Sequence, residues 1–308
     1  MRSRSTAPCW VAVIFRKATR PIALFLLLAL LLPVLSACGD PLAVGEGEIL
    51  VHFLDVGQAD CTLIRTRDTV ILVDAGSDEP GVADGVVRYL RDLDIKEIDC
   101  LVLTHPHADH IGGAPTLFRE FSIVECLLPA LATDTPLFTE LLDALEAEGC
   151  LVSEAVRGKR LTLGAVTLDV LSPDAFASGD ENTRSAVVLA KYRESTLLLT
   201  ADIPLEKEAE LLAYYGEEAL RADVLKVAHH GSATATGEQF LKALSPDYAV
   251  ISCGRGNTYG CPSAEVLARL SFVGVTVYRT DTEGTVVLRG DGNAFSPVMT
   301  TGRAGGLR

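Results

Sequence analysis

The chain has 308 residues, with 41 acidic and 27 basic side chains and a formal net charge of −14 at pH 7. This acidic balance argues against broad electrostatic capture of nucleic acid, although it does not exclude phosphate binding at a local cation site. The length suits an amino-terminal segment followed by one large α/β domain of about 270 residues with an ample core.

The first 37 residues have the composition of an export signal. Five basic residues and no acidic residue precede an apolar run over residues 22–35. The run ends at Leu35-Ser-Ala-Cys38, which resembles the lipobox of bacterial lipoproteins, in which the cysteine is lipidated. We therefore expect a signal peptide at 1–37, a lipidated Cys38 and a short linker over 38–47, with an uncleaved anchor helix or plain secretion as alternatives. Cleavage would change the charge from −14 to −19, since five basic residues leave.

The predicted domain, residues 48–290, begins with three strands. Residues 48–65 read as two strands around a turn at Gly57-Gln58, and residues 69–73 read as a third. Asp74 follows this third strand directly, at a place where a side chain can point into a site. A turn-forming role for Asp74 is the alternative.

A cluster of metal-ligand residues follows the next predicted strand, residues 98–103. His105, His107, Asp109 and His110 fall within six residues, and imidazole and carboxylate are ligands that zinc, manganese and iron favour. His105 and His107 project to the same side of an extended segment, while Asp109 and His110 start the next turn and can reach a second ion. We predict a site for two divalent metal ions, with zinc expected and manganese as the alternative.

Apolar periodicity predicts further strands and helices along the rest of the domain. Glycine-rich residues 291–308 are expected to form a flexible tail. Cys126 and Cys150, each beside a predicted strand, are a possible disulfide pair in an oxidising compartment. The further strands are expected at 121–128, 151–156, 160–163, 166–171, 195–199, 222–232 and 246–253, with two more within 277–288 on either side of Glu283-Gly284, and the helices are expected at 81–93, 135–148, 204–214 and 257–270.

Two further strand ends carry candidate ligands. Asp202 follows the strand 195–199, and its two carboxylate oxygens can bridge two cations. His229 and His230 lie near the end of the strand expected at 222–232, and they point to opposite sides if the chain is extended. We therefore expect only one of them to bind metal, and the other to contact substrate or carry a proton.

The cluster H-x-H-x-D-H after a strand resembles the dinuclear metal motif of the metallo-β-lactamase fold. Over residues 49–289 the chain resembles the extracytoplasmic hydrolase domain of ComEC-type competence proteins, here expected as a stand-alone lipoprotein without their transmembrane channel. The resemblance is carried by the histidine cluster and by Phe53-Leu-Asp-Val-Gly-Gln58, Thr200-Ala-Asp202, Lys226-Val-Ala-His-His-Gly-Ser232 and Tyr278-Arg-Thr-Asp281.

The resemblance implies an αββα sandwich in which two mixed β-sheets pack face to face with helices outside. It implies that Asp74 supports the metal-binding loop without binding metal. Asn182 and Ser185 stand where many proteins of this fold have a third histidine, and Asn182 is expected to reach substrate or a metal-bound water, or to cap a loop. Cys261 stands where the resembled domains usually have histidine, and it would supply a thiolate that favours zinc or would pack as an apolar residue.

These features predict a metallo-hydrolase, a phosphodiesterase or nuclease-like enzyme that uses a metal-activated hydroxide at a dinuclear site. Its substrate would be a small-molecule or oligonucleotide phosphodiester, with membrane contact through the lipid only and no stable protein partner. Alternatives are a same-fold hydrolase of a phosphorylcholine ester, lactone or β-lactam, and a non-catalytic surface binding protein. The predicted metal ligands are His105, His107, Asp109, His110, Asp202 and His230, and the predicted catalytic residues are Asp109, Asn182 and His229.

Overall fold

The computed structural model describes residues 40–131 and 133–298. The chain divides into two compact units, residues 1–43 and 44–308, and the second unit contains the α/β domain. The predicted signal peptide and the lipidation of Cys38 lie outside the described residues. Among the residues that are described, no helix combines the length and the apolar composition that crossing a membrane requires.

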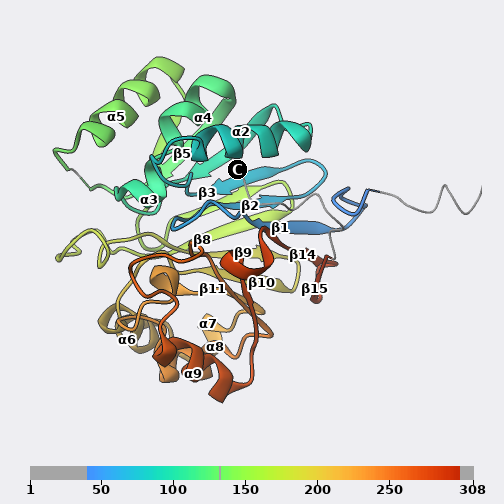
Figure 1. Cartoon of the computed structure of the whole chain (residues 1–308), viewed down its shortest axis with the longest axis vertical. Coiled ribbons are helices and arrows are strands. Elements are labelled where there is room, and N and C mark those ends of the chain that lie inside the picture. The colour runs from blue at the N-terminus through green and yellow to red at the C-terminus, as the bar shows by residue number, and fades with distance from the viewer. Residues whose placement is uncertain (1–39, 132, 299–308) are drawn as a thin grey trace, which may run out of the picture. The chain divides into compact units, whose positions relative to one another are not determined.

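Two mixed β-sheets lie at the centre of the second unit (Figure 1). Strands β3, β4, β5 and β6 of one sheet pair with one another in parallel, and so do strands β10, β11, β12 and β13 of the other. All remaining strand pairs are antiparallel. The first sheet has the order β15 (Phe295–Pro297), β14 (Val286–Gly290), β1 (Ile49–Phe53), β2 (Thr62–Arg65), β3 (Val70–Val73), β4 (Glu97–Val102), β5 (Ser122–Leu128) and β6 (Leu151–Glu154). The second has the order β13 (Thr276–Arg279), β12 (Tyr248–Ile251), β11 (Val224–Lys226), β10 (Ser195–Leu199), β9 (Val187–Tyr192), β8 (Val166–Ser172) and β7 (Arg160–Leu163).

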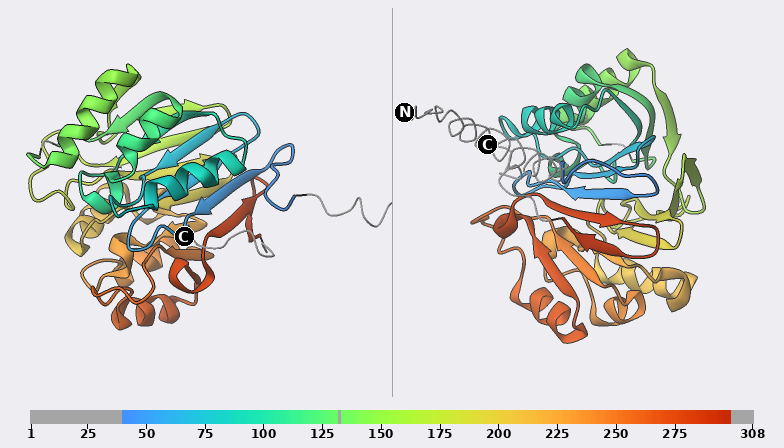
Figure 2. Two further views of the ribbon diagram at one scale, coloured as in Figure 1. Left: turned by 45° about the horizontal axis from the view of Figure 1, so that its top comes forward. Right: turned by 90° about the vertical axis from the view of Figure 1, so that its right-hand side faces the viewer.

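Helices cover the outer face of each sheet, as two further views also show (Figure 2). The first sheet carries α2 (Val82–Asp92), α3 (Ala108–Ile111), α4 (Ala114–Glu120) and α5 (Pro136–Glu148). The second carries α6 (Leu205–Tyr215), α7 (Glu217–Leu220), α8 (Glu238–Leu244) and α9 (Ala264–Val273), while α10 (Thr280–Glu283) links β13 to β14 and the 3₁₀ turn η1 (Ala228–Gly231) follows β11.

Three apolar layers hold this arrangement together, because each strand of a covered sheet buries side chains on both faces. Phe53 and Val188 belong to the layer between the two sheets. Leu101 and Leu141 belong to the layer between the first sheet and its helices, and Leu198 and Phe240 to the equivalent layer of the second. The predicted αββα sandwich is therefore confirmed.

Three local predictions are wrong. Part of the predicted flexible tail forms an edge strand, β15, whose Phe295 pairs with Gly290 and packs into the central layer. Cys126 and Cys150 are free thiols rather than a disulfide. The helix expected from residue 257 begins at Ala264, because the Ser263 side chain accepts a hydrogen bond from Val266 N and caps it there.

Candidate metal centre

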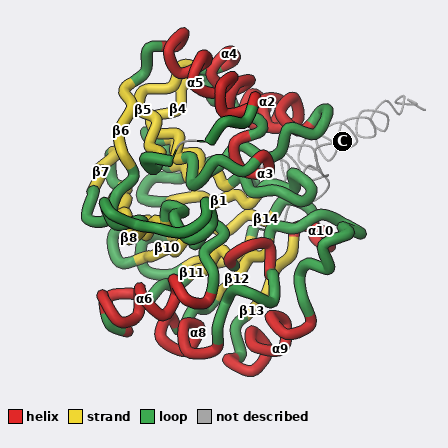
Figure 3. The backbone as a smooth tube through the Cα atoms, turned by 90° about the vertical axis from the view of Figure 1, so that its left-hand side faces the viewer, coloured by secondary structure: helices red, strands yellow, loops and turns green. Residues whose placement is uncertain are grey.

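The candidate ligands lie where parallel strands of the two sheets end. Asp74 follows β3 and His105 follows β4, while Asp202 follows β10 and the two histidines of η1 follow β11. Figure 3 views the protein from the side on which many of the connecting loops lie. Since parallel strands present their carboxyl ends at one rim, segments about 100 residues apart in sequence meet there.

Asp202 lies at the centre of the cluster and is almost fully buried. Its Oδ1 atom is 3.4 Å from His110 Nε2. Its Oδ2 atom is 3.6 Å from His229 Nε2, 3.8 Å from His230 Nε2 and 4.0 Å from His105 Nε2. The two oxygens of one carboxylate therefore face different sets of imidazoles.

One set of four residues forms a compact candidate cation site. Asp109, His110, Asp202 and His230 each offer one ligand atom, and these atoms all lie within 4.8 Å of one another. Asp109 Oδ2 is 3.2 Å from His230 Nε2, a contact that joins the two sheets. We refer to these four residues as site A.

A second group of histidines lies beside the Oδ2 atom of Asp202. His105 Nε2 is 4.0 Å from Asp202 Oδ2 and 3.0 Å from His107 Nδ1, so the His107 ring adjoins the ring of His105. His105 is buried, whereas the His107 side chain is 41 % exposed. We refer to His105, His107 and the shared Asp202 as site B, and His229 lies at its edge, beside Asp202 Oδ2.

The residues fit a divalent cation. Among the described residues, the buried atoms His110 Nε2 and Asp202 Oδ1 have no hydrogen-bond partner although they lie 3.4 Å apart. Leaving such polar atoms unsatisfied is costly, and two tetrahedral ligands with bonds of about 2.1 Å lie about 3.4 Å apart. The separations around Asp202 and Asp109 match that spacing, so the cluster has the donors and the geometry that a bound cation needs.

Asp74 lies behind the cluster and holds His110 in place. Asp74 Oδ1 accepts a 2.8 Å hydrogen bond from Thr104 N, and its Oδ2 lies 2.8 Å from His110 Nδ1. Its backbone adopts the left-handed region at φ 60°, which aspartate tolerates better than most residues. His110 Nε2 is thereby left to face Asp202.

The backbone at His229 and His230 differs from the extended chain expected from the sequence. Both residues adopt positive φ, 51° and 54°, within η1. This turn brings both rings to Asp202 Oδ2, so the expectation that they point to opposite sides is wrong. His230 is buried, and the His229 side chain is 34 % exposed.

A buried ion pair beside the cluster was missed by sequence reasoning. Lys226 Nζ donates a 2.7 Å hydrogen bond to Asp60 Oδ2, although the two residues are 166 positions apart and both are buried. Asp60 Oδ1 lies 3.4 Å from His230 Nδ1, and Ser252 O lies 3.0 Å from the same nitrogen. The sequence did hold a hint of this ion pair. Lys226 begins one of the motifs that carry the family resemblance, and Asp60 lies two residues after another, the motif that ends at Gln58.

Electrostatics keep the central carboxylate ionised. Burial alone raises the pKa of Asp202, but the positive charges of His110 and His230 outweigh burial and hold that pKa well below its usual value. Burial alone lowers the pKa of His110, and the negative charges of Asp202 and Asp74 reverse this and raise it well above the usual value. The Asp202 carboxylate is thus ionised at neutral pH.

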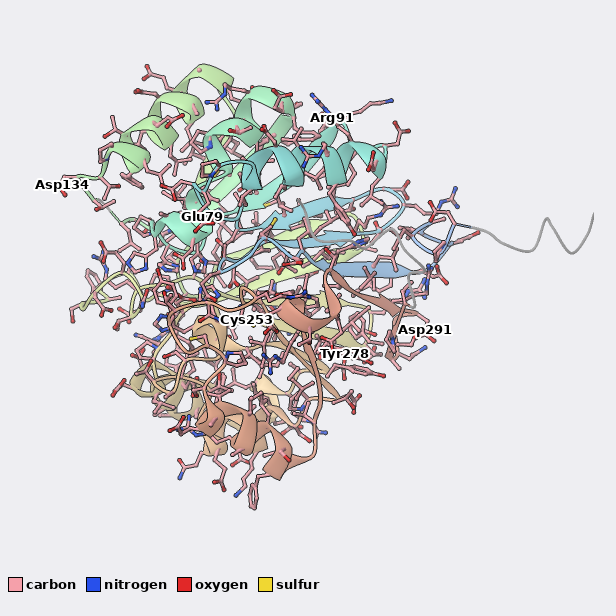
Figure 4. The ribbon with its side chains drawn as sticks, viewed as in Figure 1. Glu79, Arg91, Asp134, Cys253, Tyr278 and Asp291 are labelled. Carbon is pink, nitrogen blue, oxygen red and sulfur yellow. The ribbon has the colours of Figure 1, made fainter. Side chains whose placement is uncertain are left out.

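Three other predicted residues border the cluster without joining either site. Asn182 Oδ1 is buried and has no hydrogen-bond partner in the described part of the chain, and Ser185 donates to Glu181 O at 3.3 Å. Burial, followed by the negative charge of Asp202, raises the pKa of the half-buried Cys261 thiol. Cys253, two residues beyond the end of β12, lies near the middle of the view in Figure 4. The roles of Asn182, Ser185 and Cys261 stay predictions.

Fold and site together define a metallo-hydrolase type of α/β protein. Residues 54–255 match the model of the metallo-beta-lactamase superfamily, and the chain belongs to this superfamily. The predicted resemblance to ComEC-type proteins is also confirmed, because the chain is similar to the competence-related proteins described next.

The chain is 33 % identical over 265 residues to ComE operon protein 3 of Bacillus subtilis, a match that covers 81 % of this chain and 34 % of that protein. It is 31 % identical over 248 residues to competence protein ComA of Neisseria gonorrhoeae, covering 80 % of this chain and 33 % of that protein. The chain therefore spans about one third of the length of these curated relatives.

Solved structures agree on the fold. The metallo-beta-lactamase fold protein YhfI from Bacillus subtilis aligns with a TM-score of 0.55 and 14 % identity, covering 79 % of this chain and all of that chain. The CmlA beta-hydroxylase E377D mutant aligns with a TM-score of 0.52 and 16 % identity, covering 80 % of this chain and 55 % of that chain. At these identities the likeness concerns the fold alone.

Proposed function

We propose that the chain is a metal-dependent phosphodiesterase acting on small-molecule or short oligonucleotide phosphodiesters. The observation that carries this proposal is the buried Asp202, whose Oδ1 faces His110 and whose Oδ2 faces His229, His230 and His105. One carboxylate shared between two groups of imidazoles is the arrangement that a two-cation hydrolase needs. Zinc is the expected metal, with manganese as the alternative.

Bound cations would supply Lewis acidity toward a phosphoryl oxygen and toward a water molecule. The residues of the chain supply the remaining functions. Of the three carboxylates in the cluster, only that of Asp109 reaches solvent, with 35 % of its side chain exposed, and we assign it acceptance of the water proton. His229, the more exposed of the two histidines in η1, is placed to contact the substrate or to return a proton to the leaving oxygen.

Charge and relatives guide the choice of substrate. The relatives named for competence suggest a nucleic-acid context, which favours a phosphodiester over a lactone or a β-lactam. The net charge of −14 opposes binding of a long polyanion, so a short substrate is the better match. A phosphorylcholine ester has the same reacting group and is the second candidate.

The proposed location is the extracytoplasmic face of the cell membrane. Export by residues 1–37 and lipidation at Cys38 would tether the domain through lipid alone, without a stable protein partner. Labelling of the full chain with a radioactive fatty acid, beside a Cys38→Ala variant, tests this. Label that persists in Cys38→Ala would contradict lipidation at this cysteine.

The experiment for the activity is a substrate panel on the full chain purified in mild detergent and loaded with zinc or manganese. We expect turnover of bis-p-nitrophenyl phosphate and none of nitrocefin, and Cys261→His should raise the phosphodiesterase rate if this position tunes the site. Turnover of nitrocefin alone would replace the proposal with a β-lactam hydrolase. Two bound cations without turnover of any substrate would favour a surface binding protein.

A further inference from the structure

Each buried histidine of the cluster has one ring nitrogen turned inward and the other held by a neighbour. The Nδ1 atom of His110 lies 2.8 Å from Asp74 Oδ2, and that of His230 lies 3.0 Å from Ser252 O. The Nδ1 atom of His105 lies 3.1 Å from Thr104 Oγ1. A partner on the outer nitrogen fixes the ring orientation and the tautomer, so that the inner nitrogen keeps its lone pair for a cation.

His107 is turned the other way round. Its Nδ1 is the inner atom, 3.0 Å from His105 Nε2, and its Nε2 is the outer atom. The carboxylate oxygen that lies beside this outer nitrogen is Glu181 Oε2, at 3.6 Å. Glu181 lies in the loop between β8 and β9, one residue before Asn182.

We propose that Glu181 is the positioning residue of His107: its carboxylate accepts a hydrogen bond from Nε2–H and so presents the Nδ1 lone pair to a cation in site B. The inference rests on the proposed metal-dependent function. A shift of about 0.7 Å by either side chain converts the 3.6 Å separation into an ordinary N–H···O hydrogen bond. Both side chains are about 40 % exposed, so this bond competes with water and has a graded effect on affinity.

The contact also connects the β8–β9 loop to the metal centre. The end of that loop is already fixed to the histidine segment, because Ala186 N donates a 2.9 Å hydrogen bond to Thr104 O. A bond from His107 to Glu181 adds a second attachment, directly beside Asn182 with its buried amide oxygen. Occupation of site B would therefore order the loop segment that carries Asn182.

The neighbouring residue Asp180 provides a matched control. Its Oδ1 accepts a 2.8 Å hydrogen bond from Thr183 N, so its carboxylate is bonded to the turn and acts on His107 through charge alone. Asp180→Asn removes the same charge from the same loop as Glu181→Gln and keeps the side-chain shape. A long-range charge effect would appear in both variants, whereas a specific effect on His107 would appear in Glu181→Gln alone.

The experiment is a titration of the metal-free full chain with Mn²⁺ alone. Calorimetry measures the affinity for each ion, and electron paramagnetic resonance detects the spin-coupled pair of ions. Wild type and Asp180→Asn should bind two ions and give a spin-coupled signal. Glu181→Gln should bind one ion normally and the other about tenfold or more weakly, with loss of the coupled signal at limiting Mn²⁺. Glu181→Asp should recover part of the affinity.

Two results would overturn the inference in distinguishable ways. If Glu181→Gln binds both ions as tightly as wild type, the role of Glu181 is wrong and the proposed function is untouched. If the wild-type chain binds no Mn²⁺ or Zn²⁺ at all, the metal-dependent function is wrong, and this inference falls with it.

Discussion

The carboxylate of Asp74 and the ring of His110 lie 2.8 Å apart, 36 residues apart in sequence and both buried in the protein. This contact connects the end of β3 to the turn after β4. It decides which nitrogen of His110 faces Asp202, and the orientation of site A depends on it.

Asp74→Asn should therefore weaken cation binding without unfolding the chain. Asparagine tolerates the positive φ of this position, so the substitution removes the charge and keeps the backbone. We expect the affinity for Zn²⁺ to fall about 10- to 100-fold in competition with a chelating dye. Asp84→Asn on the exposed part of α2 is the control, and equal affinities for Asp74→Asn and wild type would contradict this role.

Lys226 and Asp60 should behave as a coupled pair in unfolding. Burial raises the pKa of Asp60, but the charges of Lys226 and His230 outweigh burial and lower it, so the carboxylate is ionised inside the protein. Lys226→Met leaves that charge unpaired and should reduce the free energy of unfolding by about 3–5 kcal/mol. Urea unfolding of the double variant Lys226→Met with Asp60→Asn should recover part of the loss. Strict additivity of the two changes would refute the coupling.

Much of the candidate site could be predicted from sequence because its residues sit at the ends of apolar strands. His105, Asp202 and His230 each follow a strand whose pattern is readable locally, and the parallel arrangement brings those ends together. Lys226 could not be paired with Asp60 in this way. The pairing depends on the packing of two sheets, and an isolated lysine near a strand end reads as a solvent-exposed residue.

Local conformation was harder to predict than element type. The positive φ angles at His229 and His230 place both rings on Asp202, whereas the periodicity of the preceding strand suggested an extended continuation. The loop that carries Glu181 has no periodic pattern, so its approach to His107 appears only in three dimensions. The edge strand β15 was missed because glycines on either side of Phe295 suggested a loose tail.

Gly112 should be intolerant of even one extra methyl group. Its φ of −57° and ψ of −38° suit any residue, but an added Cβ would lie 2.0 Å from Asp78 N and 2.5 Å from Ala108 O. Because both neighbours are backbone atoms, Gly112→Ala should lower stability by at least about 3 kcal/mol in thermal unfolding. Asp78→Ala, which changes only an exposed side chain beside the same contact, should stay within about 0.5 kcal/mol of wild type. A Gly112→Ala melting curve like that of wild type would rule out this close packing.

His52 should make the fold sensitive to acid. Burial, followed by the charges of Arg65 and Arg289, lowers its pKa from 6.5 to about 3. Between these values the unfolded chain binds a proton that the folded chain does not, so stability falls as the pH falls from about 6.5 toward 3. This one group contributes a slope of up to about 1.4 kcal/mol per pH unit.

The measurement for His52 is the free energy of unfolding between about pH 4 and pH 6. His52→Gln should show a smaller slope than wild type by about the amount that one proton gives. Tyr89→Phe removes the hydroxyl that lies 2.8 Å from His52 Nδ1 but keeps the buried imidazole, and it should retain the wild-type slope. Equal slopes for wild type and His52→Gln would show that His52 is not the group responsible.

The most direct test of the central claim is the metal content and the bis-p-nitrophenyl phosphate turnover of the full chain, measured for wild type, His107→Ala and Asp202→Asn. The shared position of Asp202 predicts two cations in wild type, loss of at least one in each variant, and at least about a hundredfold loss of turnover in Asp202→Asn. Two cations and wild-type turnover in Asp202→Asn would contradict the proposed bridging role of this carboxylate.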